Sequence, residues 1–137
     1  MAGYSGTPLI KKLGIEPGRR VALLSAPDGF AQTLGALPAG VTSVSNLRGS
    51  RPFDVIVFFT AQRAQLDRRF GELVARLEQA GGLWIAWPKK VSGVTSDVSE
   101  DVVREIALRV GLVDNKVCAI DDVWSGLRCV IRKEHRR

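Results

Sequence analysis

The sequence predicts an α/β fold of three layers, in which a mostly parallel sheet lies between helices and ends in a C-terminal antiparallel hairpin. Two observations carry this prediction. Apolar runs of strand length alternate with amphipathic helical patterns, which is the order of parallel strands joined by helical crossovers. Two further strand-like runs, 113–120 and 126–132, then follow each other with only a short turn between them.

The N-terminal segment predicts a short helix followed by a buried strand. Thr7 and Pro8 are typical of a helix start and Gly14 of a helix end, so residues 8–13 should be helical. Residues 20–25, RVALLS, form a largely apolar run of strand length. Such a run is typical of a strand that is buried on both faces of a sheet.

The next elements lead to the centre of the sheet. Residues 30–37 predict about two turns of helix, and residues 41–45 predict a short strand. Residues 54–59, DVIVFF, are the strongest strand signal, because consecutive β-branched and aromatic residues are typical of a central parallel strand. Only residues 46–52 join these two strands, which is too short for a helical crossover. Either the second strand is irregular, or the connection crosses the sheet without a helix.

The second half of the chain predicts two helices, a buried strand and the hairpin. Residues 63–80 place apolar side chains at helical spacing, and the glycine pair that follows should stop this helix. Residues 83–87, LWIAW, predict a fully buried strand. A last helix should run from a capping box at Asp97 to Gly111, and residues 121–125 should form the hairpin turn.

Length and composition predict one domain over residues 1–137, with an N-terminal helical extension (1–19) and a basic tail (132–137). A chain of 137 residues with 45% hydrophobic and 25% charged side chains is typical of a single globular domain. The longest unbroken apolar run, 55–59, is far below the roughly 20 residues needed to cross a bilayer. The N-terminus also lacks the apolar core of a secretory signal, so we expect a cytoplasmic protein that does not contact a membrane.

The charge and the cysteines argue against several kinds of site. The formal net charge is +6, and residues 132–137 carry half of it, which leaves an ordinary charge on the rest of the chain. We therefore do not expect a nucleic acid as the partner. Cys118 and Cys129 are too few for a disulfide framework and lack a zinc-binding pattern. We expect reduced thiols, near neighbours in the hairpin, and no metal site.

The order of the elements is similar to a shortened S-adenosylmethionine-dependent methyltransferase, which has a Rossmann-like fold. FDVIVFF stands in the place of the fourth strand of such enzymes, GGLWIAW stands in the place of the fifth, and the terminal hairpin completes the pattern. About 110 residues, from Arg20 to Arg132, take part in this resemblance, which concerns the fold and is a weak guide to function.

Three segments also resemble the small bacterial proteins grouped as domain of unknown function 3052. They are Tyr4–Gly14, WPKKVSG at 87–93, and LVDNKVCAIDDVWSGLRCVIRK at 112–133. This resemblance implies a bacterial cytosolic protein and supplies no catalytic residues.

The chain departs from the methyltransferase pattern where the cofactor would bind. Those enzymes have a glycine-rich loop after the first strand, whereas residues 25–30 hold one glycine and a proline without an amide hydrogen. An acidic residue ends their second strand, whereas Ser45 and Asn46 stand here. Their Asp/Asn-Pro-Pro-Tyr motif is replaced by TAQR at 60–63. We therefore expect no cofactor, with S-adenosylmethionine as the alternative.

The candidate ligand site follows from the fold, because ligands of open α/β sheets bind at the carboxyl ends of the strands. Lysine and arginine side chains at these ends can bind a phosphate or a carboxylate. The alternative is a solvated loop with ordinary surface charge. The candidate ligand-binding residues are Asp28, Gly29, Arg63, Trp87, Lys89, Lys90 and Ser92.

The tryptophans have different expected roles. Trp84 and Trp87 are three residues apart in one strand, so they should face opposite sides of the sheet and pack in the core. Trp124 lies in the predicted hairpin turn, where it either folds back onto the sheet or binds a partner. The sequence leaves both roles of Trp124 open.

The residues predict no catalytic group. His135, the only histidine, lies in the basic tail, and the adjacent Asp121 and Asp122 are more typical of backbone capping. Our main hypothesis is a non-catalytic domain that binds a small anionic ligand or a protein partner in the strand-end cleft. The first alternative is a divergent S-adenosylmethionine-dependent methyltransferase. The second is weak nucleic-acid binding through the basic tail.

Overall fold

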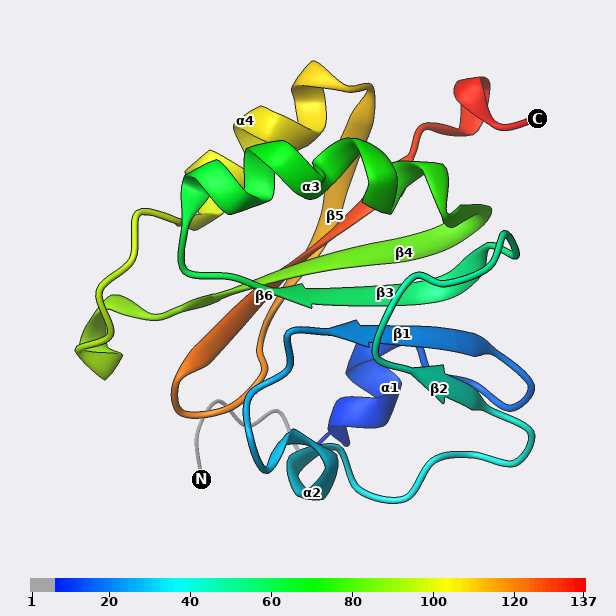
Figure 1. Ribbon diagram of the computed structural model, residues 1–137, viewed down its shortest axis with the longest axis horizontal. Helices are drawn as coiled ribbons and strands as arrows, with labels where there is room; N and C mark the ends of the chain where they lie inside the picture. The colour runs from blue at the N-terminus through cyan, green and yellow to red at the C-terminus, as the bar shows by residue number, and fades with distance from the viewer. Residues whose placement is uncertain (1–6) are drawn as a thin grey trace.

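The computed structural model describes residues 7–137 and confirms the predicted α/β fold (Figure 1). In this part of the chain the strands form one six-stranded sheet in the order β2-β1-β3-β4-β6-β5. The first four are parallel, and β6 is antiparallel to both β4 and β5. The strands are β1 (Arg20–Leu24), β2 (Thr42–Val44), β3 (Phe53–Phe59), β4 (Leu77–Pro88), β5 (Leu112–Ala119) and β6 (Trp124–Ile131). Residues 1–6, which include Tyr4 at the start of the segment Tyr4–Gly14, lie outside the described residues.

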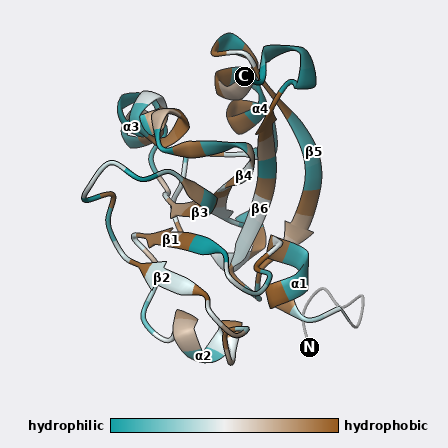
Figure 2. Cartoon of the chain, turned by 90° about the vertical axis from the view of Figure 1, so that its right-hand side faces the viewer, coloured by the Kyte–Doolittle hydropathy of each residue, from teal (hydrophilic) through white to brown (hydrophobic). Residues whose placement is uncertain are grey.

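Helices cover the two faces of the sheet and bury a separate apolar cluster on each. The helices are α1 (Leu9–Leu13), α2 (Phe30–Leu34), α3 (Arg63–Ala75) and α4 (Glu100–Arg109), with short 3-10 turns at Lys90–Ser92 and Lys133–His135. One cluster joins the sheet to α3 and α4, and the other joins it to α1 and α2. Figure 2 shows hydrophobic stretches along β3 and β4, in the middle of the sheet. None of the helices within residues 7–137 has the length and apolar character needed to cross a membrane.

Strand β3 supplies both clusters, as its apolar sequence predicts. Ile56 and Phe58 face α3 and α4, whereas Val57 and Phe59 face α1 and α2. The two tryptophans of β4 likewise lie on opposite faces, which confirms the prediction. The indole Nε1 of the fully buried Trp84 donates a hydrogen bond to the Leu13 carbonyl at 3.1 Å, so its one polar atom is satisfied.

The connection from β2 to β3 crosses the sheet without a helix, which is one of the two alternatives left open by its length. The Arg76 guanidinium, at the end of α3, holds this connection. It donates hydrogen bonds to the carbonyls of Leu47, Arg48 and Arg51 and lies 5.2 Å from the centre of the Phe53 ring. One side chain thus replaces the packing that a crossover helix would supply.

The predicted end of α3 is wrong, because the helix stops at Ala75 and β4 already begins at Leu77. The glycine pair lies inside β4 and does not stop a helix. A Cβ at Gly81 would lie 2.8 Å from the Asp54 carbonyl oxygen, and one at Gly82 would lie 2.3 Å from the Nε of Arg128. These glycines therefore allow close approach within the sheet, a use that local sequence cannot distinguish from a helix stop.

Two smaller predictions are also corrected. The N-cap of α4 is Ser99, whose hydroxyl accepts a hydrogen bond from the Val102 amide, and Asp97 instead accepts one from the Arg63 amide at 2.6 Å. The two cysteines are not neighbours. Cys129 belongs to the cluster under α3 and α4, while Cys118 packs against the cluster on the other face. The β6 partner of Cys118 is Gly126, three positions before Cys129, so the two side chains point to opposite sides of the sheet.

Candidate functional site

A cavity of about 620 Å³ lies at the carboxyl end of the sheet, where β1 and β2 finish. This volume is within the range of sites that bind small molecules and cofactors. The loop between β1 and α2 forms one wall, and the residues after β2 form the other. The residues that line it include Leu23, Pro27, Asp28, Gly29, Phe30 and Asn46.

The loop after β1 leaves its backbone open toward this cavity. Gly29 has a φ of +83°, a conformation that favours glycine, and no atom of the protein lies within 4 Å of the place its Cβ would occupy. Ser25 also has a positive φ, 57°, directly after β1. Ser25 and Gly29 thus turn the backbone of the loop through positive φ angles. Gly29 also adds no side chain that would fill the cavity.

The polar side chains that line the cavity include an acid on one wall and, beside two serines, an amide on the other. The Asp28 side chain is exposed. Asn46 is also exposed, and its Oδ1 accepts a hydrogen bond from the Arg48 amide at 3.0 Å, which leaves its NH₂ group as the free donor. The cavity thus offers a carboxylate and an amide to the hydroxyl and amino groups of a ligand.

Three aromatic rings pack against one another at this end of the sheet. Phe59, at the end of β3, makes edge-on contacts with Phe30 and Trp124, with ring centres 4.9 and 5.2 Å apart. Trp124 is half-buried against the apolar cluster that also holds Phe30. The hairpin tryptophan is therefore folded back onto the sheet, and its proposed contact with a partner stays a prediction.

The cations predicted for the ligand site do not converge. Arg63 points toward α4, where its guanidinium pairs with Glu105 at 2.5 Å. The Nζ of Lys89 donates a hydrogen bond to the Asp121 carbonyl at 2.8 Å, on the side of the hairpin. The Ser92 hydroxyl donates to the Lys89 carbonyl at 2.6 Å and so stabilises the local turn.

Two further candidates line a separate cavity of about 410 Å³ beside the start of α4. Trp87 forms part of its wall and is 7% exposed, and Lys90 lies at its rim with Asp97. Of the seven predicted ligand-binding residues, the structure thus brings together Asp28 with Gly29, and Trp87 with Lys90. The prediction that these residues bind a ligand stays a prediction.

Sequence reasoning missed Asn46 as a site residue and gave no role to Thr60. Asn46 stands where a carboxylate was sought, and a search for acids passes over an amide. Thr60 is 3% exposed, and its hydroxyl donates to the Gln65 side chain at 2.6 Å and accepts from the Gln62 amide. Thr60 therefore shapes the start of α3, and its polar group is already satisfied.

The titratable groups of the described residues offer no activated nucleophile. Burial raises the pKa of Cys129 to about 12, and burial also raises the pKa of Cys118, so both thiols stay protonated at neutral pH. The hydrogen bond from Arg63 lowers the pKa of Glu105, which keeps this carboxylate charged. No group of three or more His, Cys, Asp or Glu residues within 7–137 is placed to hold a metal ion.

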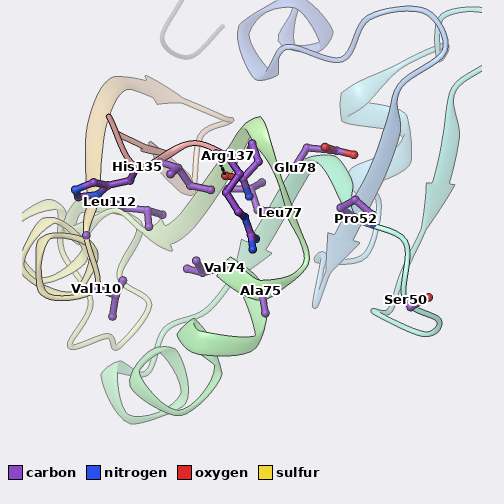
Figure 3. Close-up of a pocket in the computed structure, with 13 residues that line it drawn as sticks. Ser50, Pro52, Val74, Ala75, Leu77, Glu78, Val110, Leu112, His135 and Arg137 are labelled. Atoms are coloured by element: carbon purple, nitrogen blue, oxygen red, sulfur yellow. Dashed lines mark hydrogen bonds between the residues drawn. The ribbon is translucent and has the colours of Figure 1, made fainter. Parts of the chain in front are cut away.

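A third cavity, of about 590 Å³, lies at the opposite end of the sheet (Figure 3). Leu77, Leu112 and Val74 form its apolar side, and Glu78, His135 and Arg137 are among its polar residues. The only histidine of the sequence therefore lies far from the strand ends at which α/β ligands bind.

No family model matches the chain, so the resemblance to domain of unknown function 3052 gains no support, and no curated protein matches its sequence. Solved structures do match. An S-adenosylmethionine-dependent methyltransferase from Aquifex aeolicus superimposes with a TM-score of 0.60 at 16% identity, covering 90% of this chain and 88% of that one.

The chain has a methyltransferase-like fold. The magnesium protoporphyrin IX methyltransferase of Synechocystis PCC 6803, solved with bound SAH, matches with a TM-score of 0.58 at 12% identity, covering 90% of this chain and 78% of that one. The ribosomal protein L11 methylase of Lactobacillus delbrueckii subsp. bulgaricus gives the same TM-score at 14% identity, with 90% and 75% covered. At these identities the matches establish the fold alone.

The matches nevertheless correct two of our predictions. We expected a non-catalytic ligand-binding or partner-binding domain, and we expected no cofactor. The Synechocystis methyltransferase was solved both with SAH and with SAM bound, and the matches from Aquifex aeolicus and Lactobacillus delbrueckii are a methyltransferase and a methylase. The structural neighbours therefore favour the alternative, a divergent S-adenosylmethionine-dependent methyltransferase.

Proposed function

We propose that the protein is a divergent methyltransferase that binds S-adenosylmethionine in the cavity between the β1–α2 loop and the end of β2. One observation carries this proposal. The cavity lies at the carboxyl ends of two adjacent parallel strands, in a sheet of the methyltransferase-like order β2-β1-β3-β4-β6-β5. In open α/β sheets this is the end at which ligands bind.

The residues of the cavity fit the cofactor, although they differ from the usual motif. Gly29 leaves room for a ligand to approach the backbone, since a Cβ there would meet only open space. The Asp28 carboxylate can accept hydrogen bonds from an amino or hydroxyl group, and the Asn46 amide can donate to a ribose oxygen. Leu23 and Phe30 complete the wall for the apolar parts.

The bound cofactor would supply an electrophilic methyl group on a sulfonium centre. The chain's own part is to orient the cofactor and to exclude water around it. Because Asn46 replaces the usual carboxylate, the ribose hydroxyls lose a charged acceptor, and charged hydrogen bonds are the stronger ones. We therefore expect the affinity for the cofactor to be modest.

Titration calorimetry with S-adenosylmethionine and with S-adenosylhomocysteine tests this proposal. Ala31 lines the cavity, whereas its neighbour Gln32 is exposed and lies outside it. We expect the native protein to bind, Ala31→Trp to lose binding because the indole takes up part of the space that the cofactor needs, and Gln32→Trp to bind as the native protein does. Absence of heat with the native protein at millimolar cofactor, or equal affinity of the two variants, would contradict the proposal.

We further propose a bacterial cytosolic setting. The two free thiols support the cytosolic part of this proposal, since reduced cysteines are typical of cytosolic proteins. Thiol titration of the protein purified without reductant checks this point, with two reactive thiols expected per unfolded chain.

A further inference from the structure

The positive charge of the protein gathers at the end of the sheet opposite the candidate cofactor cavity. At this end β1, β3 and β4 begin and β6 finishes. Figure 1 shows it on the right, where the C-terminal segment, the end of α3 and the loop before β3 come together, and Figure 2 looks onto it. We call it the basic end and define it by residues 16–20, 48–54, 76–78 and 128–137.

The basic end accounts for the whole net charge of the molecule. It holds ten Lys and Arg residues and four acids, a balance of +6, which equals the formal net charge of the chain. The remaining ten cations and ten acids cancel. Its cations are Arg19, Arg20, Arg48, Arg51, Arg76, Arg128, Arg132, Lys133, Arg136 and Arg137.

The helices carry arginines as well, but those of α3 and α4 other than Arg68 are paired with carboxylates. Arg69 pairs with Glu72 at 2.5 Å, and Arg104 pairs with Glu100 at 2.6 Å. At the basic end, by contrast, the ion pairs among the described residues are those of Arg19, with Glu16 at 2.8 Å and Asp54 at 3.5 Å. The exposed side chains of the loop before β3 and of the C-terminal segment have no carboxylate partner in residues 7–137.

Arg128 shows that this charge lacks a counter-charge. Arg128 is half-buried, and its guanidinium lies against Gly82. Any side chain at position 82 would collide with this guanidinium. Burial, together with the positive charges of Arg136 and Arg19, lowers the pKa of Arg128, and no described carboxylate pairs with it. A partly desolvated cation surrounded by other cations is stabilised when an anion binds there.

From this arrangement we propose that the basic end binds the phosphate backbone of a nucleic acid. The cations extend from the entry of β1 to the C-terminal segment, so they suit a chain of phosphates better than a single small anion. The one phenylalanine, tyrosine or tryptophan ring at this end, Phe53, is buried, with arginines 4.7 and 5.2 Å from its centre. Binding should therefore use phosphate contacts without base stacking and be independent of nucleotide sequence.

This surface does not depend on the proposed methyltransferase function, because it lies at the other end of the strands. The sequence pointed only to the basic tail, 132–137, as a weak nucleic-acid contact, whereas the folded surface is larger than that tail. Segments far apart in the sequence contribute to it, and their charge is concentrated only after folding. Arg51 and Arg132 come from two such segments, and both are exposed and have no ion pair within residues 7–137.

Fluorescence anisotropy with a labelled single-stranded RNA of about 20 nucleotides, at several salt concentrations, tests the proposal. The double variant Arg51→Gln with Arg132→Gln removes two charges from the basic end. Lys11→Gln with Arg68→Gln removes two exposed charges elsewhere and serves as the matched control. We expect the double variant of the basic end to bind the RNA roughly tenfold more weakly. The slope of log affinity against log salt concentration should fall in magnitude by about 1.4, and the control should keep both the affinity and the slope.

Three results would overturn the proposal. The first is a failure of the native protein to bind the RNA at low salt. The second is an equal loss of affinity in the two double variants. The third is that pyrophosphate displaces the labelled RNA as well as unlabelled RNA does at equal phosphate concentration. The last result would indicate a small-anion site. Because all four substituted side chains are exposed, we expect both variants to fold, and thermal unfolding checks this.

Discussion

At the scale of single residues, the adjacent glycines of β4 show how position in the fold decides the role of a residue. Both lie in the strand, and neither adopts the positive φ that would require glycine. What they provide is space. Gly81 faces a backbone carbonyl that cannot move without the sheet, whereas Gly82 faces the end of the flexible Arg128 side chain.

This difference leads to a prediction for the two alanine variants. We expect Gly81→Ala to lower the free energy of unfolding by about 1–3 kcal/mol, because its Cβ would lie 2.8 Å from the Asp54 carbonyl. We expect Gly82→Ala to lower it by less than about 1 kcal/mol, because Arg128 can turn away. Urea unfolding measures both values, and equal losses would show that the two positions are not distinguished by their neighbours.

At the scale of elements, the link between β2 and β3 is the unusual part of the fold. Parallel strands are normally joined by a helix that covers the sheet. Here eight residues lie between Val44 and Phe53, and their carbonyls are held by Arg76 from the end of α3. The length of the link was visible in the sequence, but the residue that secures it was not, because Arg76 is distant in sequence and was expected within a helix.

Removal of this guanidinium should therefore destabilise the protein. We expect Arg76→Met, which keeps an apolar side chain near Phe53, to lower the free energy of unfolding by about 2 kcal/mol, since three charge-assisted hydrogen bonds are lost. Arg68→Met, at an exposed position of α3, is the control and should change it by less than about 0.5 kcal/mol. A similar small change in both variants would show that the link does not depend on Arg76.

At the scale of the whole molecule, the two ends of the sheet have different chemistry. The carboxyl end has a cavity with a carboxylate and an amide, and the amino end has an excess of arginines. The seven residues of β3 separate the two ends by roughly 20 Å, more than twice the Debye length of about 8 Å at physiological ionic strength, so the charge at one end acts only weakly on the other.

The two proposed sites should accordingly be independent. We expect Arg51→Gln with Arg132→Gln to bind S-adenosylmethionine with native affinity, and Ala31→Trp to bind RNA with native affinity. Calorimetry and anisotropy on the same preparations measure these four values. A loss of cofactor binding in Arg51→Gln with Arg132→Gln would show that the two ends are coupled.

Part of the candidate site was predictable from sequence. Asp28 and Gly29 follow a strongly apolar strand, so their place at a ligand-binding strand end could be inferred. The predicted convergence of Arg63 with Lys89 could not be judged, because long side chains choose among partners that only the fold supplies. Arg63 pairs with Glu105, a residue 42 positions away, and Lys89 binds a hairpin carbonyl.

The sequence by itself determined the class of the fold, since runs such as DVIVFF and LWIAW are apolar on both faces and can be buried only between two layers of helices. The tertiary structure alone decided where the charge lies. Net charge is a sum over the chain, whereas an electrostatic surface depends on which distant segments meet, and here four of them bring their arginines to one end of the sheet.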